Sequence, residues 1–492
     1  MTQKRPNILY IMSDQHAAGV MGCANDPAAD TPNLDRLAQS GTRFTRAYCP
    51  SPLCLPSRMS MLTGQQPHEQ DCWTNDDILD SARPTWLNGL GAAGYRPVLA
   101  GRMHSLGPDQ LRGYTQRLVG DHSPSWPGVT RKTLGPLAKT SGPFAESIIR
   151  SGAGQSSYQV MDADVLEAAV TYLTTHAESG TSDPFCLTAS FMLPHPPYVA
   201  DEVDFDAVKD RVLPPKYPEP PQNEHPWITK WRMAKSLDAI ALEDVHRARC
   251  GYYGLVRQLD RFVGTLLATL NEIGASENTL VIYVSDHGDH LGERGLFWKH
   301  TFFEDSVKVP LIMAWSGTIP AGQTIVEPVE TGGLGNTILG LVGADLLPNA
   351  TMKPFVDKIL PELKDQNTVT AQPIFIEYCT DDMPAWAEGF AVQQRAVILG
   401  DHKFVYIHGY PDQLYDLKKD PDELCNLAED ASSAEIANKM RALIFKDWDP
   451  DDVAAKIAKR RADKVILKAW AENARPEEPY RWNLEPSQNF LT

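Results

Sequence analysis

The sequence lacks any run of about 18 consecutive apolar residues, the length that a helix needs to cross a bilayer. Its first apolar run, Ile8 to Met12, is too short for the core of a signal peptide and is followed at once by Ser13 and Asp14. We therefore expect a cytoplasmic protein that neither spans nor binds a membrane.

A disulfide framework is also lacking. The 8 cysteines are scattered, and none belongs to a C-x-x-C pair, so reduced thiols are expected. The sequence has no internal repeats.

Positive charge is in deficit, with 46 Lys and Arg against 63 Asp and Glu and a net charge of -17. Such a field repels phosphate backbones and anionic lipid surfaces, which argues against nucleic acid and membrane partners. It would also repel a small anionic substrate. A site for such a substrate therefore needs local cations and a metal.

The overall composition is that of a folded globular protein. Apolar residues make up 42% and charged residues 22%, which excludes a collagenous, coiled-coil or wholly disordered chain. A length of 492 residues indicates one large domain with at least one appendage.

Apolar runs alternate with helical periodicities along the first two thirds of the chain. The runs predict strands at 7–12, 98–100, 184–193 and 280–284, and the periodicities predict helices at 31–41, 162–176 and 242–273. This order predicts an α/β fold with a large, doubly wound, mostly parallel sheet flanked by helices. Polar residues follow each strand, at the sheet edge where such folds carry their chemistry.

Three domains are expected: a catalytic α/β domain over 1–365, a small antiparallel α+β domain over 366–448, and a helix with an extended arm over 449–492. The proline-rich segment 205–232 is expected to be a long surface loop of the kind that forms lids. The arm from Glu478 to Thr492 is too apolar to be free. It either docks on its own chain or crosses to a partner in a homo-oligomer, a dimer or tetramer, and we favour the second.

The window from Cys54 to Gly64 carries the pattern C-x-P-S-R followed by L-T-G. The pattern resembles the signature of the sulfatases of the alkaline phosphatase superfamily. The resemblance extends from about Pro6 to Asp430, and residues 101–114, 184–198 and 285–304 are most similar to choline sulfatases. It implies that a formylglycine-generating enzyme oxidises Cys54 to formylglycine. The hydrated aldehyde has one hydroxyl that attacks and a second that later expels the bound group, which a thiol or serine cannot do.

The resemblance implies a metal site. Its ligands would be Cys54 and the residues at two strand ends: Asp14 and Gln15 after the first strand, and Asp286 and His287 after the second. Oxygen ligands suit calcium, magnesium or manganese, and one imidazole shifts the balance toward manganese. Many sulfatases carry Asp and Asn where Gln15 and His287 stand, and these two residues resemble choline sulfatases and phosphonate monoester hydrolases.

Further residues match catalytic and substrate-contacting positions. Arg58 is expected to hold the hydrate; Arg102, His195 and Lys299 to neutralise the sulfate oxygens; His195 or Lys299 to protonate the leaving alcohol; and His104 to take the second hydroxyl's proton. Asn75 and Glu377 resemble substrate-contacting residues. The alternative interpretations are that Asn75 caps a loop and that Glu377 is a solvated residue at a strand end. Choline sulfatases carry a tryptophan-rich stretch after the equivalent of residues 119–124, where only Trp126 stands here.

These observations predict a sulfuric ester hydrolase acting on the sulfate monoester of a small alkyl, choline-like or sugar alcohol. A phosphonate monoester or phosphodiester hydrolase with the same machinery is the alternative. An inactive scaffold of the same fold is a more remote one, because every reactive residue type is retained.

Overall fold

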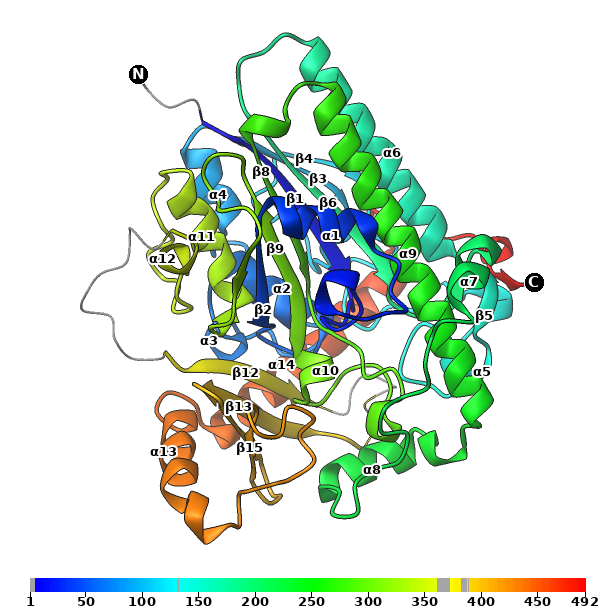
Figure 1. The fold of residues 1–492 in the computed structure, drawn as a ribbon, viewed down its shortest axis with the longest axis vertical. Coiled ribbons are helices and arrows are strands. Elements are labelled where there is room, and N and C mark those ends of the chain that lie inside the picture. Colours follow the sequence, from blue (N-terminus) through cyan, green and yellow to red (C-terminus); the bar gives the residue numbers. More distant parts are fainter. Residues whose placement is uncertain (1–4, 131, 361–371, 382–386, 388) are drawn as a thin grey trace.

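A large mixed sheet forms the centre of the computed structural model (Figure 1), which describes residues 5–130, 132–360, 372–381, 387 and 389–492. The sheet has nine strands in the order β10-β2-β9-β8-β1-β6-β3-β4, with β11 beside β2. Their bounds are β1 (Asn7–Asp14), β2 (Thr42–Tyr48), β3 (Arg96–Gly101), β4 (Gln116–Val119), β6 (Phe185–Pro194), β8 (Thr279–Ser285), β9 (Lys308–Ala314), β10 (Gln323–Ile325) and β11 (Val329–Glu330).

The strands at the centre of the sheet run parallel, as predicted. Strand β1 lies between β6 and β8, with Ile8 opposite both Cys186 and Leu280. Strand β9 is antiparallel to both β8 and β2, so the sheet is mixed. Because β1, β6 and β8 are parallel, their carboxyl ends meet at one edge and bring their polar residues together.

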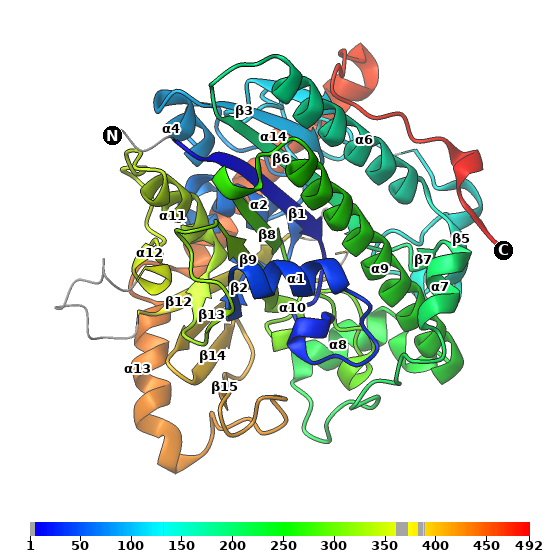
Figure 2. The same ribbon diagram turned by 45° about the horizontal axis from the view of Figure 1, so that its top comes forward.

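Helices cover both faces of the sheet, and β1 contributes alternate residues to each face. Leu9 and Ile11 pack in one apolar cluster with α1 (Pro32–Ser40), α6 (Ser157–Glu178) and α9 (Leu242–Glu272). Ile8, Tyr10 and Met12 pack in the other with α2 (Cys54–Thr63), α4 (Trp86–Ala92) and α11 (Leu334–Leu341). This period of two is that of a strand buried on both sides. Figure 2 shows the two layers.

Shorter helices lie between these elements along the chain: α3 (Pro67–Gln70), α5 (Glu146–Ile149), α7 (Glu202–Val208), α8 (Pro226–Ala234), α10 (Glu304–Val307) and α12 (Val356–Ile359). Within the proline-rich segment, residues 209–225 form neither helix nor strand, as expected. The helix that follows, α8, buries Trp227 and Trp231, which stack with 6.1 Å between ring centroids. This part of the segment is therefore packed into the core.

A separate antiparallel sheet confirms the predicted C-terminal fold. It contains β12 (Ile374–Thr380), β13 (Val392–Leu399), β14 (His402–Ile407) and β15 (Gln413–Asp416), followed by α13 (Ala434–Ile444) and the long α14 (Pro450–Ala474). The boundary predicted between residues 365 and 366 lies outside the described residues.

The C-terminal arm docks on its own chain. Strand β16 (Phe490–Leu491) pairs with β5 (Gly152–Gln155), which in turn pairs with β7 (Val199–Ala200). Nearer to α14, the Trp482 amide donates to the Asp121 carbonyl at 2.8 Å. The structure thus shows the first of the two arrangements considered above, and the expected homo-oligomer stays a prediction.

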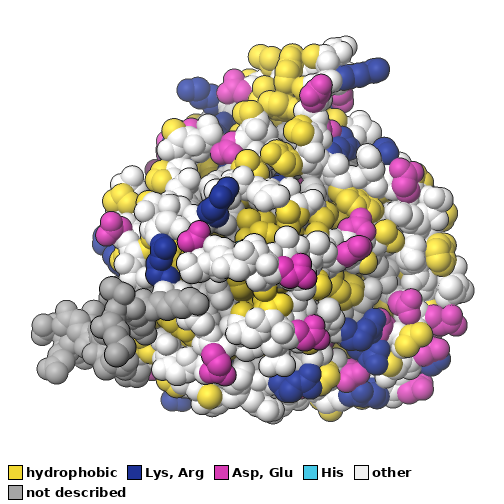
Figure 3. Space-filling model, turned by 90° about the horizontal axis from the view of Figure 1, so that it is seen from above, with side chains coloured by type: hydrophobic (Ala, Val, Ile, Leu, Met, Phe, Trp, Pro, Cys, Tyr) yellow, Lys and Arg dark blue, Asp and Glu magenta, His cyan; other side chains and the backbone are white. Residues whose placement is uncertain are grey.

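All 8 cysteines lie in described residues, and none is in a disulfide, which confirms the expected thiols. Among the described helices, none combines the length and apolar character needed to cross a membrane. On the face in Figure 3, acidic and basic side chains are interspersed rather than gathered by sign.

Candidate active site

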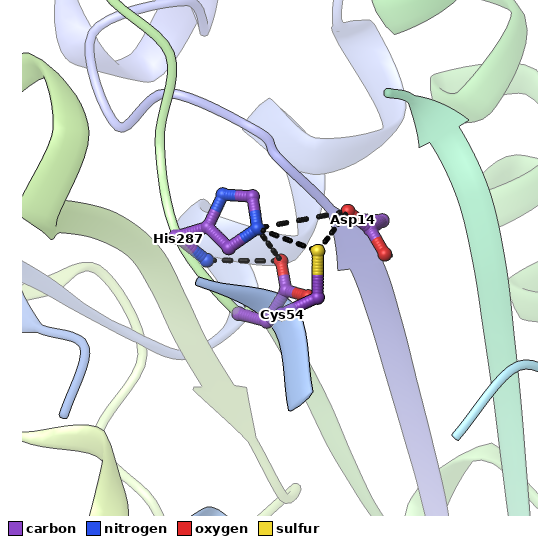
Figure 4. Close-up of side chains that lie close together, drawn as sticks. Asp14, Cys54 and His287 are labelled. Atoms are coloured by element: carbon purple, nitrogen blue, oxygen red, sulfur yellow. Dashed lines mark hydrogen bonds and ion pairs between the residues drawn. The ribbon is translucent and has the colours of Figure 1, made fainter. Parts of the chain in front are cut away.

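Cys54 is the first residue of α2 and lies at the edge of the sheet where β1 and β8 end. Its side chain is buried, with Sγ 3.1 Å from His287 Nε2 and 3.7 Å from Asp14 Oδ1 (Figure 4). Lys299 Nζ lies 3.5 Å from the same sulfur. Burial, together with Asp14, raises the pKa of this thiol to about 11. The unmodified thiol is therefore protonated at neutral pH and a poor nucleophile.

Arg58, on the next turn of α2, holds two carboxylates in place. Its NH2 lies 3.0 Å from Asp14 Oδ2 and its Nε lies 2.8 Å from Asp286 Oδ2. The second oxygens of the two carboxylates, Asp14 Oδ1 and Asp286 Oδ1, lie 3.8 and 3.6 Å from His287 Nε2. Each carboxylate thus uses one oxygen for the arginine and turns the other toward the imidazole.

His287 presents a lone pair to these oxygens. Its Nδ1 lies 3.2 Å from the Gly288 carbonyl, which can only accept, so Nδ1 carries the proton and Nε2 does not. Burial, more than any neighbouring charge, lowers the pKa of His287 to about 4. The imidazole is therefore neutral at neutral pH, the state in which histidine binds metals.

The four side chains Asp14, Cys54, Asp286 and His287 form a buried group that fits a divalent cation. Their ligand atoms all lie within 4.8 Å of one another. Two carboxylate oxygens and one imidazole nitrogen form a donor set that suits manganese, magnesium or calcium. The hydrogen bond from His287 to Gly288 fixes the ring as the partners of metal-bound histidines do.

Gln15, the remaining predicted ligand, directs its amide to other groups. Its Oε1 accepts from Lys299 Nζ at 2.5 Å and its Nε2 donates to Asp289 Oδ2 at 2.6 Å. The backbone of Gln15 has φ 69, a left-handed conformation that costs about 1 kcal/mol or more in a residue with a side chain. The role of Gln15 as a ligand stays a prediction.

Arg102 links Asp14, one of the four candidate metal ligands, to Asp121 and His104. Its Nε lies 3.0 Å from Asp14 Oδ2, its NH1 lies 3.4 Å from Asp121 Oδ1, and its NH2 lies 2.8 Å from His104 Nδ1. Because a guanidinium only donates, Nδ1 of His104 accepts, and the proton of the neutral ring is on Nε2. His104 can accept a proton at Nδ1 only when Arg102 releases that contact.

His195 directly follows β6, Lys299 lies in the loop after β8, and both line the same cavity as Cys54. Nδ1 of His195 donates to the Pro196 carbonyl at 2.7 Å. Burial, assisted by the charge of Lys299, holds the pKa of His195 well below its usual range. In the free protein His195 is therefore a neutral side chain without a proton to give from Nε2.

A cavity of about 440 Å³ opens over these groups. Among the predicted residues, its lining contains Cys54, Asn75, Arg102, His104, His195 and Lys299. It is also lined by side chains that the sequence analysis missed, including His122, Phe144, Tyr158, His300 and Lys468. These come from segments without a motif, and no local pattern in the sequence distinguishes them.

Asn75 and Glu377 differ in position. Asn75 lines the cavity, and its Oδ1 accepts from the Leu55 amide at 3.0 Å, which holds the start of α2. Glu377 is buried, with its carboxylate 2.7 Å from Trp73 Nε1 and 2.8 Å from His68 Nδ1. It is not among the described residues that line the cavity, and the alternative of a solvated strand end is wrong.

Comparison with known proteins identifies the class to which this fold and site belong. Residues 6–344 match the sulfatase family, and residues 292–447 match the family described as N-sulphoglucosamine sulphohydrolase, C-terminal. A choline-sulfatase from Rhizobium meliloti (strain 1021) is 32% identical over 99% of this chain and 95% of its own length.

Solved structures share the fold at lower identity. The phosphonate monoester hydrolase of Agrobacterium radiobacter is 21% identical with a TM-score of 0.73, covering 90% of this chain and 95% of its own. BT4656, solved in complex with its substrate D-glucosamine-2-N,6-O-disulfate, is also 21% identical with a TM-score of 0.73, covering 91% and 99%. The chain therefore belongs to the sulfatase family and is a sulfatase.

Proposed function

We propose that the protein hydrolyses the sulfate monoester of a small alkyl, choline-like or sugar alcohol, with formylglycine at position 54 as the nucleophile and a divalent metal held by Asp14, Asp286 and His287. The observation that carries this proposal is the position of Cys54, buried at the start of α2 within reach of these three residues and of Lys299.

The contacts of each residue suggest its role in binding the metal and the sulfate. A bound divalent cation would lower the pKa of a hydrate hydroxyl and withdraw charge from the sulfate. Arg58 fixes both carboxylates through its salt bridges. Lys299 and Arg102 line the cavity, where their positive charges stabilise the negative charge on the sulfate oxygens.

Proton transfer follows from the two histidines. Because His195 is neutral in the free protein, Lys299 is the better donor to the leaving alcohol: its ammonium passes a proton to the ester oxygen as the sulfur–oxygen bond breaks. His195 donates a hydrogen bond to the sulfate only after its Nε2 has taken up a proton from solvent. As Arg102 turns toward the sulfate, Nδ1 of His104 becomes available to take the proton of the second hydroxyl. That proton transfer expels the sulfate and restores the aldehyde.

The decisive experiment is mass spectrometry of the tryptic peptide 47–58 from a host that has the formylglycine-generating enzyme. Replacement of sulfur by oxygen is expected at Cys54, whereas Cys49 in the same peptide should keep its sulfur and serve as the internal control. The variant Cys54→Ala should lose turnover but keep the fold, because the change leaves little cavity. An active preparation in which Cys54 is entirely unmodified would overturn the mechanism.

A phosphonate monoester or phosphodiester substrate is the second candidate, which the shared fold of the phosphonate monoester hydrolase favours. Paired kinetics with a sulfate monoester and a phosphonate monoester separate the two, and we expect the larger kcat/KM for the sulfate. The homo-oligomer, the cytoplasmic location and the substrate contacts of Asn75 and Glu377 stay predictions from the sequence.

A further inference from the structure

The cavity over Cys54 extends beyond the groups that handle the sulfate. Of the residues that line it, Arg102, His195 and Lys299 are buried like Cys54, whereas the side chain of Lys468, which lines it together with Gly128 and Phe144, is 44% exposed. A volume of about 440 Å³ lies within the range of sites that hold a small organic molecule. The wall that includes Lys468 therefore faces the alcohol part of a substrate.

Lys468 belongs to helix α14, and contacts of this helix before and after Lys468 hold the lysine at this wall. One turn earlier on the same face of α14, Lys464 is buried, and its Nζ lies 2.7 Å from Asp77 Oδ1 and 3.1 Å from Thr74 Oγ1. Two residues later, the Trp470 ring meets the Trp126 ring edge-on, with 4.7 Å between centroids. Trp126 thus supports the helix, and it is not among the described residues lining the cavity.

The aliphatic part of the Lys468 side chain packs over Gly128, and it has room there because glycine has no side chain. A Cβ on Gly128 would lie 3.1 Å from Cδ of Lys468, and Gly128 has φ +63, which also favours glycine. The Lys468 ammonium lies 4.0 Å from Glu472 Oε1, a separation at which a surface ion pair is weak. Asp76, the acidic residue of this wall, has one oxygen 3.3 Å from the Gly128 amide, which donates to it.

We propose that Lys468 receives a second anionic group, a carboxylate or sulfate carried by the alcohol, and so selects anionic over cationic sulfate esters. This rests on the proposed function. A quaternary ammonium at this wall would face the like charge of Lys468, and apart from histidines the described aromatic lining is limited to Phe144 and Tyr158. The local cation also offsets the net charge of -17, which would otherwise repel a doubly charged substrate.

The test uses the full-length, formylglycine-bearing enzyme and three sulfate esters that differ in the charge of the alcohol: those of 3-hydroxypropanoate, 1-propanol and choline. Wild type should give the highest kcat/KM for the first. Lys468→Glu should change the ratio of kcat/KM between the anionic and cationic esters by about tenfold in favour of choline O-sulfate, the scale of reversing a partly exposed ion pair. Lys468→Met keeps the stem, removes the charge, and should give an intermediate ratio.

Lys459→Glu is the matched control, because it makes the same change of net charge at an exposed position nine residues earlier, on the opposite side of α14. It should leave all three kcat/KM values unchanged. An unaltered ratio in both Lys468 variants, or a wild-type preference for choline O-sulfate, would overturn the proposal while leaving the sulfatase mechanism intact. Failure of wild type to hydrolyse any of the three would instead refute the proposed substrate class together with this inference.

Discussion

Replacing Arg102 by alanine should weaken both the fold and the chemistry, and the structure predicts how the loss of stability depends on pH. The guanidinium is 3% exposed and contacts Asp14 and Asp121, both of them buried carboxylates. Removing one partner of a buried ion pair costs about 3–5 kcal/mol, because the remaining charge stays out of water without compensation. We expect a decrease of this size in the free energy of unfolding at pH 7.

The sign of the pH dependence follows from Asp121. Burial raises the pKa of this carboxyl, but Arg102, His122 and His104 together outweigh burial and hold the pKa well below its usual range, with the charge of Arg102 as the largest single contribution among them. A carboxyl whose pKa is lowered by folding adds stability above its unfolded pKa of about 3.9, and this stability is lost as the pH falls through the folded pKa. Without Arg102 the folded pKa of Asp121 should rise. The stability gap between wild type and Arg102→Ala should therefore be largest near pH 7 and narrower at pH 4.

Urea denaturation followed by circular dichroism at the two pH values measures this gap. Arg102→Lys keeps the charge and should recover much of the stability and substantial activity, whereas Arg102→Ala should lose about 10²-fold or more in kcat. Arg112→Ala is the control, since Arg112 is equally buried but donates to the carbonyls of Leu79 and Leu106, and the carboxylate that it contacts, Asp109 at 3.5 Å, is 31% exposed rather than buried. Its stability gap should be nearly the same at both pH values. Equal gaps at pH 4 and pH 7 for Arg102→Ala would refute the reasoning.

Three further outcomes are expected. Chelation of divalent cations should abolish turnover and lower the melting temperature, and one of calcium, manganese or magnesium should restore both; a preparation that keeps its activity after exhaustive chelation would contradict the metal site. Truncation after Ala474 removes the amide that binds the Asp121 carbonyl and should raise KM and lower the melting temperature, and unchanged values would show that the arm does not support the site. In unmodified protein, iodoacetamide at pH 8 should alkylate the exposed Cys425 well before Cys54, because Cys54 is buried with a pKa near 11, and equal rates would show that the site is open.

The centre of the site could be predicted from the sequence because it depends on local patterns. Apolar runs that end in Ser-Asp identified β1 and β8, and parallel pairing then required Asp14 and Asp286 to meet. The Cys54 signature placed the proposed nucleophile, and the structure brings Cys54 close to Asp14. The antiparallel strand β9 was not predicted, since its short apolar run is followed by Ser316 and Gly317 rather than by Ser-Asp.

The walls of the site could not be predicted in this way. Lys464 reaches Thr74 across 390 residues of sequence, and such contacts depend on how helices pack rather than on any nearby pattern. Glu377 shows the converse limit, because its position in the sequence suggested a substrate contact, whereas the fold surrounds it with Trp73 and His68. The surface on which the C-terminal arm docks could not be predicted either. The apolar residues of the arm indicate that it packs against something, but they do not identify the partner surface.

The burial of Cys54 also constrains when its modification can occur. At 1% exposure the side chain is out of reach of another enzyme once the fold has closed, yet its neighbour His287 follows it by 233 residues in the chain. At a synthesis rate of about 5–20 residues per second, Cys54 has left the ribosome for roughly 10–50 s before that neighbour is made. If Cys54 is converted as proposed, the long sequence separation within the site would give the modifying enzyme time to act on the nascent chain. Purified, folded protein with an unmodified thiol should accordingly resist conversion when the modifying enzyme is added afterwards, and should accept it after unfolding.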